Sequence, residues 1–425
     1  MKILLLGSGG REHTFAYMIA KSALCEKLFI APGNTGTEKH GENISIAATD
    51  FDAIADFVLK NGIEMVVVGP EDPLVKGVYD YFLADEKLKH VAVIGPSKAG
   101  AQLEGSKDFA KKFLQHYNIP TAKYATFTST QIEEAIKYVD DQNVPIVLKA
   151  DGLAAGKGVV ICELKEEAKQ ELREMLTQQK FGAAGDKVVI EEFLKGIEMS
   201  VFILTDGKNY LTLPTAKDYK RIGVGDTGLN TGGMGAISPV PFATDELMKK
   251  VDEQITKPTI AGLQQEKIIY KGFIYIGLMI VNGEPYVIEY NCRMGDPETQ
   301  AVLPRIKSDL VDLFISVHKG NLNEKKLEVL PYAAATVVLA SRGYPEKFEK
   351  EKLISNLQQT NECLVFHAGT RMRKNGDIET NGGRVLAITS FSRELKDAVA
   401  IAIRNAEIID FEGKYFRGDI GKDVF

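Results

Sequence analysis

Residues 3–13 read ILLLGSGGREH, an apolar run that stops at a cluster of glycines. Residues 15–19 continue with apolar side chains at the i, i+3, i+4 spacing of a helix face. Two further apolar runs, at residues 65–68 and 91–94, each lead into Gly-Pro. Continuous apolar strands that alternate with helices indicate a parallel sheet covered on both faces. We therefore predict an α/β protein with a doubly wound parallel sheet over residues 1–103.

Three glycine-bearing turns follow strands of this predicted sheet, at residues 7–10, 69–72 and 95–98. Ligands of such sheets bind outside the carboxyl ends of the strands. The turns are therefore the first candidates for contact with a ligand.

The pattern changes after the first hundred residues, and three further regions can be separated. Residues 104–325 carry mixed helix and strand signals, with a smaller α+β unit at about residues 121–192. Residues 321–329 are polar and have the composition of a linker. Residues 330–425 contain β-type runs and one amphipathic helix, which predicts a small C-terminal α+β domain.

The composition excludes several classes of protein. The 425 residues include 52 Lys and Arg against 58 Asp and Glu, a net charge of −6, so we expect no nucleic-acid partner bound through bulk charge. The four cysteines form no CxxC pair and the six histidines no HExxH motif, which argues against a zinc site or a disulfide framework. No window approaches the ~18 apolar residues of a membrane span, and the N-terminal apolar run is too short for a signal-peptide core. We expect a cytoplasmic protein without a membrane partner, as a monomer or weak dimer.

The first glycine turn is suited to an anion. Backbone N–H groups of Gly9, Gly10 and Arg11 stand between a strand and a helix, where the helix dipole favours phosphate. A nicotinamide dinucleotide fits less well, because Glu12 replaces the third glycine and no acid ends the second strand. A tight turn without a ligand is the remaining alternative. His13 is expected to be a helix-surface residue.

A second glycine-rich segment, KADGLAAGKG at residues 149–158, lies between two predicted strands. Its spacing differs from that of a Walker A loop, and no Ser or Thr follows Lys157. A hairpin of glycines and lysines can still cover a triphosphate with its backbone N–H groups. The alternative is an ordinary solvated hairpin.

Acidic side chains flank the turn after the strand at residues 188–198. Such a turn can offer a backbone edge to adenine and a carboxylate to ribose hydroxyls. Taken alone, the segment is better explained as a surface acid cluster.

The strand VIEYNCR at residues 287–293 is more specific. Glu289 and Asn291 point to the same face of a strand, and both present oxygen atoms, the ligands that Mg²⁺ prefers. Arg293 follows on that face, where its guanidinium could clamp a carboxylate or a phosphate. A structural Glu–Arg pair is the alternative.

The loop NTGGMGA at residues 230–236 is dense in glycine and is preceded by Asp218, Lys220, Arg221 and Asp226. A flexible linker rarely carries this mixture of charges. We interpret the segment as a substrate loop.

In this order, the segments resemble the glycinamide ribonucleotide synthetases, or phosphoribosylamine–glycine ligases, of the ATP-grasp superfamily. The resemblance extends from residues 7–13 to residues 415–421, and its most specific parts are residues 230–236 and RMGDPE at 293–298. It implies an ATP-grasp fold for residues 104–325, with residues 121–192 as a small lid.

The resemblance also implies a reaction in de novo purine biosynthesis. The carboxylate of glycine would attack the γ-phosphate of ATP, and the amine of 5-phosphoribosylamine would then attack the glycyl phosphate. The products would be glycinamide ribonucleotide, ADP and phosphate. ATP and Mg²⁺ (or Mn²⁺) would be required.

Site residues are carried over from the family motifs to the matching positions of this chain. The resemblance assigns nucleotide contacts to Lys107, Lys149, Gly152, Gly156, Lys157, Gly158, Glu191, Leu194 and Glu198. It assigns substrate contacts to Gly9, Gly10, Arg11, Glu12, Asp218, Asp226, Thr231, Gly232, Gly233 and Arg293. Metal ligands would be Glu289 and Asn291, and the catalytic roles would fall to Arg293, Lys149 and Asp218.

Several positions depart from the family pattern. Val224 stands where the family usually has Asp, which leaves Asp226 without an acidic neighbour there. Leu229 replaces a usual Pro, and Met294 a common Phe. The strand at residues 273–278 carries no second acidic metal ligand, and no general base is evident. Another ATP-grasp ligase, a nicotinamide oxidoreductase and a non-catalytic nucleotide sensor are the competing hypotheses.

Overall fold

A computed structural model describes residues 1–153, 158–177 and 186–425 of the chain. Gly156 and Lys157, two of the expected nucleotide contacts, lie outside these residues. No helix in the described ranges is both long and apolar enough to cross a membrane.

The N-terminal region is a parallel sheet, as predicted. Its strands are β1 (Lys2–Gly7), β2 (Lys27–Pro32), β3 (Glu42–Asn43), β4 (Met65–Val68) and β5 (Ala92–Pro96), in the order β5-β4-β1-β2-β3. Alternate residues of β1 enter different cores: Leu4 and Leu6 pack on one face of the sheet, Ile3 and Leu5 on the other. Both faces are therefore covered, which explains why the strand is apolar at every position.

Some helices of this region begin at a side-chain cap. The helices are α1 (Gly10–Ile19), α2 (Phe51–Asn61), α3 (Glu71–Lys76), α4 (Val78–Ala84) and α5 (Lys98–Gly105). The side chain of Asp50 accepts the N–H of Ala53 to cap α2, and that of Ser97 accepts the N–H of Gly100 to cap α5. Ser106 separates α5 from α6 (Lys107–His116) and caps the latter.

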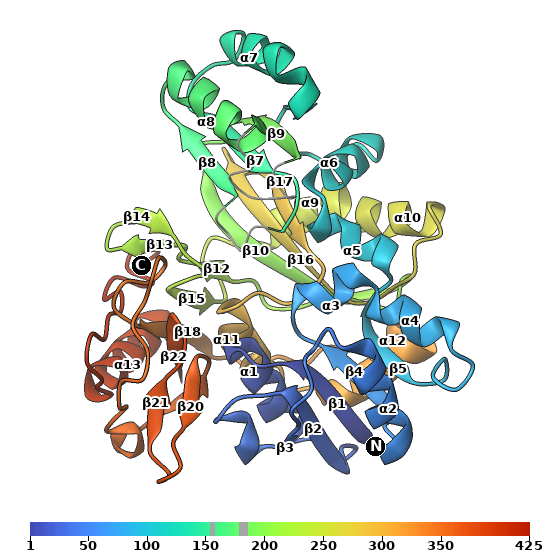
Figure 1. Ribbon diagram of the computed structural model, residues 1–425, viewed down its shortest axis with the longest axis vertical. Helices are drawn as coiled ribbons and strands as arrows, with labels where there is room; N and C mark the ends of the chain where they lie inside the picture. Colours follow the sequence, from blue (N-terminus) through green and yellow to red (C-terminus); the bar gives the residue numbers. More distant parts are fainter. Residues whose placement is uncertain (154–157, 178–185) are drawn as a thin grey trace.

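The central region continues the N-terminal sheet. Strand β16 (Tyr270–Val281) pairs with β5 at Tyr270 and Lys271, and then with β10 (Ile197–Thr205) and β17 (Glu284–Asn291). Strand β11 (Tyr210–Thr212) extends the edge beyond β10. The sheet thus runs without a break from the N-terminal region into the central one (Figure 1).

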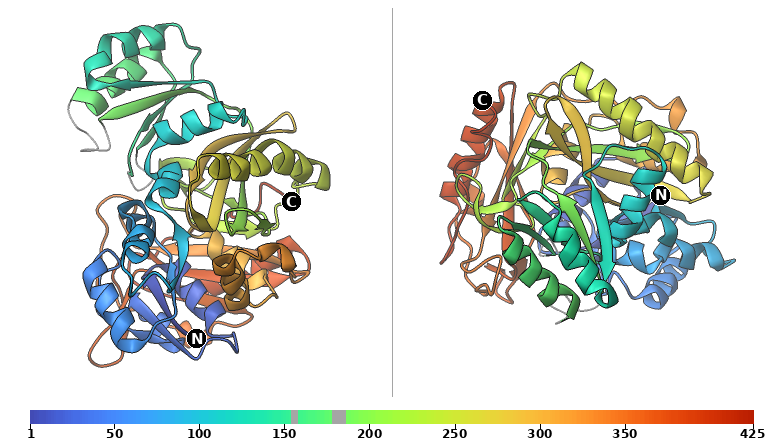
Figure 2. Two further views of the ribbon diagram at one scale, coloured as in Figure 1. Left: turned by 90° about the vertical axis from the view of Figure 1, so that its right-hand side faces the viewer. Right: turned by 90° about the horizontal axis from the view of Figure 1, so that it is seen from above.

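A separate lobe stands above this body in Figure 1 and projects away from it in the left view of Figure 2. It contains an antiparallel sheet, ordered β6 (Tyr124–Thr128), β9 (Lys187–Glu192), β7 (Ile146–Ala150) and β8 (Val159–Cys162). Helices α7 (Ile132–Asp140) and α8 (Lys165–Thr177) share an apolar core with that sheet. This lobe, built on residues predicted to form the lid, has its own core and its own sheet.

The C-terminal sheet takes strands from two regions of the sequence. Its order is β12 (Lys217–Asp218), β15 (Gly235–Ser238), β18 (Ala333–Ala340), β22 (Arg384–Ser392) and β19 (Cys363–His367). The predicted amphipathic helix is α13 (Leu395–Ile408), which packs Val399 and Ala406 into the core of this sheet. Because β15 pairs with β18, the glycine-rich loop before β15 is fixed beside the C-terminal region.

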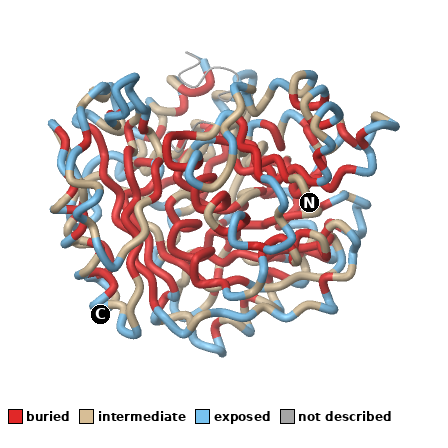
Figure 3. Tube along the Cα trace, turned by 90° about the horizontal axis from the view of Figure 1, so that it is seen from below, coloured by how far each residue is buried: buried red, intermediate tan, exposed pale blue. Residues whose placement is uncertain are grey.

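The remaining elements connect these sheets. They are η1 (Thr37–Lys39), η2 (Ser129–Gln131), β13 (Arg221–Gly223), β14 (Thr227–Asn230), α9 (Asp245–Val251), η4 (Asp252–Thr256), α10 (Lys257–Gln265), α11 (Glu298–Val302), η5 (Leu303–Arg305), α12 (Leu310–Lys319), η6 (Leu322–Glu324), η7 (Leu357–Gln359), β20 (Thr370–Met372) and β21 (Ile378–Thr380). Figure 3 shows the buried segments running through the middle of the molecule, with exposed segments around them.

His13 is buried, so its expected place on a helix surface is wrong. Its side chain is only 2% exposed, because β19 of the C-terminal region packs over α1. The Nδ1 atom accepts the backbone N–H of His367 at 2.7 Å, and the ring lies 5.2 Å from that of His40. Burial, with the nearby His367, His40 and Lys39, lowers the pKa of His13 to about 2, and burial lowers that of His367 to about 4.

Because these two histidines are buried, we predict that the contact between the N-terminal and C-terminal regions is sensitive to acid. Each histidine is neutral in the folded protein but binds a proton near pH 6.5 in the unfolded chain. Its contribution to the free energy of unfolding is therefore fully present above pH 6.5 and decreases as the pH falls. Between pH 7 and pH 5, we expect a loss of about 2 kcal/mol of unfolding free energy for each of His13 and His367. Urea denaturation at the two pH values measures the loss.

The matched variants for this measurement are His13→Asn and His90→Asn. Asparagine can place an oxygen near the Nδ1 position without titrating, so His13→Asn is expected to reduce the pH dependence. His90 is exposed, and its replacement is expected to leave the dependence unchanged. An equal pH dependence in wild type and His13→Asn would contradict the assignment.

Candidate active site

A cavity of about 540 Å³ lies where the N-terminal sheet, the lobe, the central sheet and the C-terminal sheet meet. Most of the charged side chains predicted for the site face it. Its lining includes Arg11, Lys107, Lys149, Gly158, Glu191, Asp218, Thr231, Gly232, Glu289, Asn291 and Arg293. Residues far apart in the sequence are thus brought to one chamber.

Strand β17 places Glu289 and Asn291 on the wall of this cavity. Glu289 lies opposite Gly277 of β16, beside an irregularity in the ladder. Burial would raise the pKa of Glu289, but Lys220, Lys149 and Lys107 outweigh it and hold the pKa below its ordinary value. The Glu289 carboxylate is therefore ionised at neutral pH, and together with the Asn291 amide it offers the oxygen ligands that suit Mg²⁺.

Arg293 is held by two carboxylates that the sequence analysis missed. Its Nε donates to Glu71 at 3.1 Å, and its NH2 group lies 2.8 Å from Glu104. Glu104 also accepts the backbone N–H of Cys292 at 2.8 Å. Burial opposes ionisation of Glu71, but Arg293 and Arg11 lower its pKa to about 2. The structural Glu–Arg pair with Glu289, the alternative considered above, is not formed; Glu71 and Glu104 fix the guanidinium instead.

Glu71 follows the Gly69-Pro70 turn at the carboxyl end of β4, and that turn was a candidate from the sequence. No comparable local signal marks Glu104, which lies within α5.

One of the lysines predicted to contact phosphates, Lys149, pairs with another carboxylate. Lys149 and Lys111 each lie 3.0 Å from Glu191, which is only 3% exposed. Lys107 donates to the carbonyl of Gly152 at 3.2 Å. Burial lowers the pKa of Lys111 to about 8, although Glu191 opposes this. Lys111, also missed from the sequence, lines the cavity one helical turn after Lys107.

Three other expected nucleotide contacts do not line the cavity. Gly152 precedes the lining residue Leu153, Leu194 lies in the turn between β9 and β10, and Glu198 pairs with Lys220 at 3.0 Å. Lys220 also lies 3.6 Å from Glu289, so it connects Glu198 to the predicted metal ligand.

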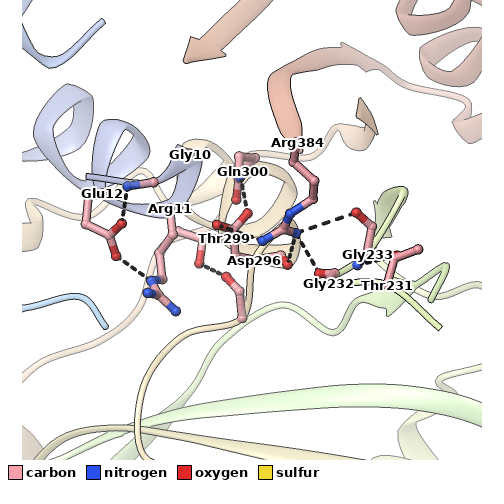
Figure 4. Close-up of polar contacts among 12 residues, drawn as sticks. Gly10, Arg11, Glu12, Thr231, Gly232, Gly233, Asp296, Thr299, Gln300 and Arg384 are labelled. Atoms are coloured by element: carbon pink, nitrogen blue, oxygen red, sulfur yellow. Dashed lines mark hydrogen bonds and ion pairs between the residues drawn. The ribbon is translucent and has the colours of Figure 1, made fainter. Parts of the chain in front are cut away.

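A hydrogen bond to Glu12, which follows the first glycine turn, holds that turn in place (Figure 4). The Gly9 N–H donates to Glu12 at 2.6 Å, and Arg11 donates to the other oxygen of Glu12 at 2.5 Å. A Cβ at Gly10 would lie 2.6 Å from the side-chain nitrogen of Gln300, so any larger residue there would require the Gln300 side chain to shift. Arg11 reaches the cavity, whereas Gly9, Gly10 and Glu12 support the turn behind it.

The C-terminal region contributes two residues that hold the glycine-rich loop. Arg384 donates to the carbonyls of Gly232, at 2.6 Å, and of Asp296, at 2.5 Å (Figure 4). Tyr344 accepts the N–H of Gly232 at 2.8 Å. Thr231 and Gly232 line the cavity and Gly233 does not. No sequence pattern connected Arg384 or Tyr344 to this loop, because they are more than a hundred residues away from it.

Asp226 is not brought to the cavity. It lies in the turn between β13 and β14, and its carboxylate accepts from buried Arg417 at 2.6 Å. Asp218 does line the cavity, from strand β12. Of these two predicted substrate contacts, Asp218 faces the chamber and Asp226 does not.

Comparison with known proteins matches three parts of the chain to domains of one family. Residues 1–104, 105–299 and 334–423 match the N domain, the ATP-grasp (A) domain and the C domain of phosphoribosylglycinamide synthetase. The phosphoribosylamine–glycine ligase of Yersinia pestis is 47% identical over 426 residues, which cover 99% of this chain and 98% of that protein.

Solved structures agree with this result. The phosphoribosylamine–glycine ligase of Thermotoga maritima has a TM-score of 0.86 and 37% identity, covering 99% of this chain and 100% of that one. The biotin carboxylase domain of Hydrogenobacter thermophilus 2-oxoglutarate carboxylase is similar in fold, with a TM-score of 0.73 at 18% identity, covering 98% of this chain and 91% of that one. The chain therefore belongs to the phosphoribosylglycinamide synthetase family, the phosphoribosylamine–glycine ligases, with an ATP-grasp domain at its centre.

Proposed function

We propose that this chain joins glycine to 5-phosphoribosylamine at the expense of ATP, forming glycinamide ribonucleotide, ADP and phosphate. The proposal rests on one observation. In this chain, which belongs to the family, the same cavity is lined by Lys107, Lys149, Glu289, Arg293 and Arg11. Cationic and oxygen-bearing side chains from three regions converge there, as a reaction between a nucleotide and a second phosphorylated substrate requires.

The proposed reaction has two chemical steps. A carboxylate oxygen of glycine attacks the γ-phosphorus of ATP, the bond to the bridging oxygen breaks, and ADP leaves. The amine of phosphoribosylamine then attacks the carbonyl carbon of glycyl phosphate, phosphate leaves with the bonding electrons, and the new amide loses a proton. Positioning and charge neutralisation supply most of the catalysis in such transfers.

Residues of this chain fit the two tasks of positioning the substrates and neutralising their charge. Lys107 and Lys149 place positive charge on the cavity wall for the phosphates of ATP. Arg293 is held at two points by Glu71 and Glu104, so it need not reorganise when charge develops on the acyl phosphate. Glu191 is already paired with Lys149 and Lys111, and we expect it to act on ATP by orienting these lysines.

Glu289 and Asn291 are the proposed ligands of Mg²⁺ (or Mn²⁺), because both donate oxygen from the same strand to the cavity. When bound, the metal neutralises phosphate charge. Leu194 and Glu198 as adenosine contacts, and Gly9, Gly10, Glu12 and Gly233 as substrate contacts, are further parts of the proposal. Domain boundaries at residues 1–103, 104–325 and 330–425, a cytoplasmic location and a monomer or weak dimer stay predictions of the sequence.

The test is phosphate release from ATP and Mg²⁺ with glycine and with phosphoribosylamine formed in situ from ribose 5-phosphate and ammonia. We expect release to require both substrates and the product to have the mass of glycinamide ribonucleotide. ADP formed only with another amine or carboxylate would keep the ATP-grasp chemistry and reject these substrates. A folded protein that consumes no ATP under any pairing would contradict the proposal.

A further inference from the structure

The loop after strand β2 contains a buried asparagine whose side chain contacts two distant segments of the chain. Asn34 is only 9% exposed. Its side-chain nitrogen donates to the carbonyl of Ser8 at 2.8 Å, to that of Gly9 at 3.4 Å and to that of His367 at 2.8 Å. One amide therefore joins this loop to the first glycine turn and to the C-terminal region.

The other half of the Asn34 amide shapes its own loop. The side-chain oxygen accepts the backbone N–H groups of Gly36 at 2.8 Å and of Thr37 at 3.2 Å. Only an amide serves both sides, because it combines two N–H donors with an acceptor oxygen. A carboxylate could replace the oxygen, but it has no N–H to donate to the carbonyls.

The three segments lie in close contact at Gly36. A Cβ there would lie 2.2 Å from the ring of His13 and 2.8 Å from the Cβ of His367. The backbone N–H of His367 donates to His13 Nδ1 at 2.7 Å, and its carbonyl accepts from Asn34. The peptide groups on both sides of His367 are therefore anchored to the N-terminal region.

A short series of hydrogen bonds leads from Asn34 to the cavity. In a trans peptide the C=O and N–H groups point in opposite directions, so fixing the Ser8 carbonyl also fixes the direction of the Gly9 N–H. That N–H donates to one oxygen of Glu12 at 2.6 Å, and the other oxygen accepts from Arg11 Nε at 2.5 Å (Figure 4). Arg11 lines the cavity, so the orientation of its guanidinium depends on Asn34.

Arg11 is the member of this series that can meet a ligand. Its guanidinium also donates to the carbonyl of Met294 at 3.3 Å and lies 4.0 Å from Glu71, so it is held from several sides. A planar guanidinium suits a phosphate group. Two substrates of the proposed reaction carry phosphate. Because Lys107 and Lys149 are assigned to ATP, Arg11 is available to phosphoribosylamine.

We infer that Asn34 is a positioning residue for phosphoribosylamine, which orients Arg11 through the first glycine turn and Glu12. The inference rests on the proposed function. It adds a residue to which no role was assigned from the sequence. It also gives the C-terminal region a part in binding this substrate, because the carbonyl of His367 holds the same amide.

The test compares Asn34→Asp with wild type. The carboxylate keeps an oxygen for the two backbone N–H groups of its loop, but it presents a second oxygen to the carbonyls of Ser8 and His367, so these bonds are lost. We expect the apparent KM for phosphoribosylamine, formed from ribose 5-phosphate and excess ammonia, to rise about 10-fold. The KM values for ATP and for glycine should not change.

A second variant and a matched control separate the two halves of the amide. In Asn34→Ser the hydroxyl can still accept the N–H of Gly36 but is too short to reach the three carbonyls, so the same selective rise is expected. Thr37→Val is the control, because Thr37 Oγ1 accepts the backbone N–H of Asn34 at 2.8 Å. This change weakens the loop and leaves the carbonyl contacts in place. It should lower the melting temperature without changing any of the three KM values.

An unchanged apparent KM for phosphoribosylamine in both Asn34 variants would overturn the inference. So would equal rises in all three KM values with a lower melting temperature, or failure of both variants to fold, since these results indicate a structural role. A selective rise in Thr37→Val would also overturn it, because the effect would then come from the loop and not from the carbonyl contacts. If wild type itself forms no glycinamide ribonucleotide, the proposed function fails, and this outcome is seen before any variant is made.

Discussion

Glu289→Ala is expected to lower kcat by at least about 1,000-fold while the protein stays folded. The side chain faces the cavity, and Lys220, Lys149 and Lys107 keep its carboxylate ionised. Its removal takes away the only charged ligand proposed for the metal and leaves three lysines around the space. Lys220 keeps its contact with Glu198 at 3.0 Å, which is why we expect the fold to survive.

Single-turnover phosphate release measures this effect, with thermal melting as the test of folding. Glu284→Ala is the matched control, because Glu284 begins the same strand and pairs with Lys250 at 2.6 Å, outside the cavity lining. It should retain wild-type turnover. Glu289→Asp, with a shorter arm, should need more Mg²⁺ or Mn²⁺ to reach its maximal rate. Wild-type activity in Glu289→Ala would remove the metal assignment.

Arg293→Met is expected to lower kcat by about 100- to 1,000-fold, the usual effect of losing one preorganised charge at a transition state. Unlike Glu289→Ala, it should also destabilise the fold by about 3–5 kcal/mol, because buried Glu104 loses its cation. Glu71 loses its main partner as well. The stabilisation that comes from ionised Glu71 is present in wild type above the ordinary pKa of a glutamate and is lost as the pH falls toward 2. At neutral pH the variant therefore lacks the part that Arg293 supplies, while Arg11 remains near Glu71.

Urea denaturation and kinetics of the double variant separate these two effects. Arg293→Met combined with Glu104→Gln removes the unpaired charge, so stability should recover in part while turnover stays low. Arg342→Met is the control, since Arg342 is 61% exposed and lies 3.8 Å from Glu349. Recovery of turnover in the double variant would show that Arg293 is structural and not catalytic.

Local sequence patterns were sufficient to predict much of the fold and part of the site. Continuous apolar strands indicated a parallel sheet, and β1 indeed sends alternate residues into two cores. The same period of two placed Glu289 and Asn291 on one face of a strand, and both line the cavity. These predictions needed only the geometry of a few consecutive residues. The family motifs added Lys107, Lys149 and Arg293 to the predicted site residues.

Other features depend on contacts between distant segments. Glu71 meets Arg293 across 222 positions, and His13 is buried by a strand 354 positions away. Arg384 reaches the loop at Gly232 only because β15 pairs with β18. The sequence by itself determined which strands and turns carry oxygen atoms, glycines and charges, since these follow from local periodicity and turn chemistry. Only the tertiary structure decided which charges pair, as with Glu71 and Arg293, because pairing depends on how separate elements pack.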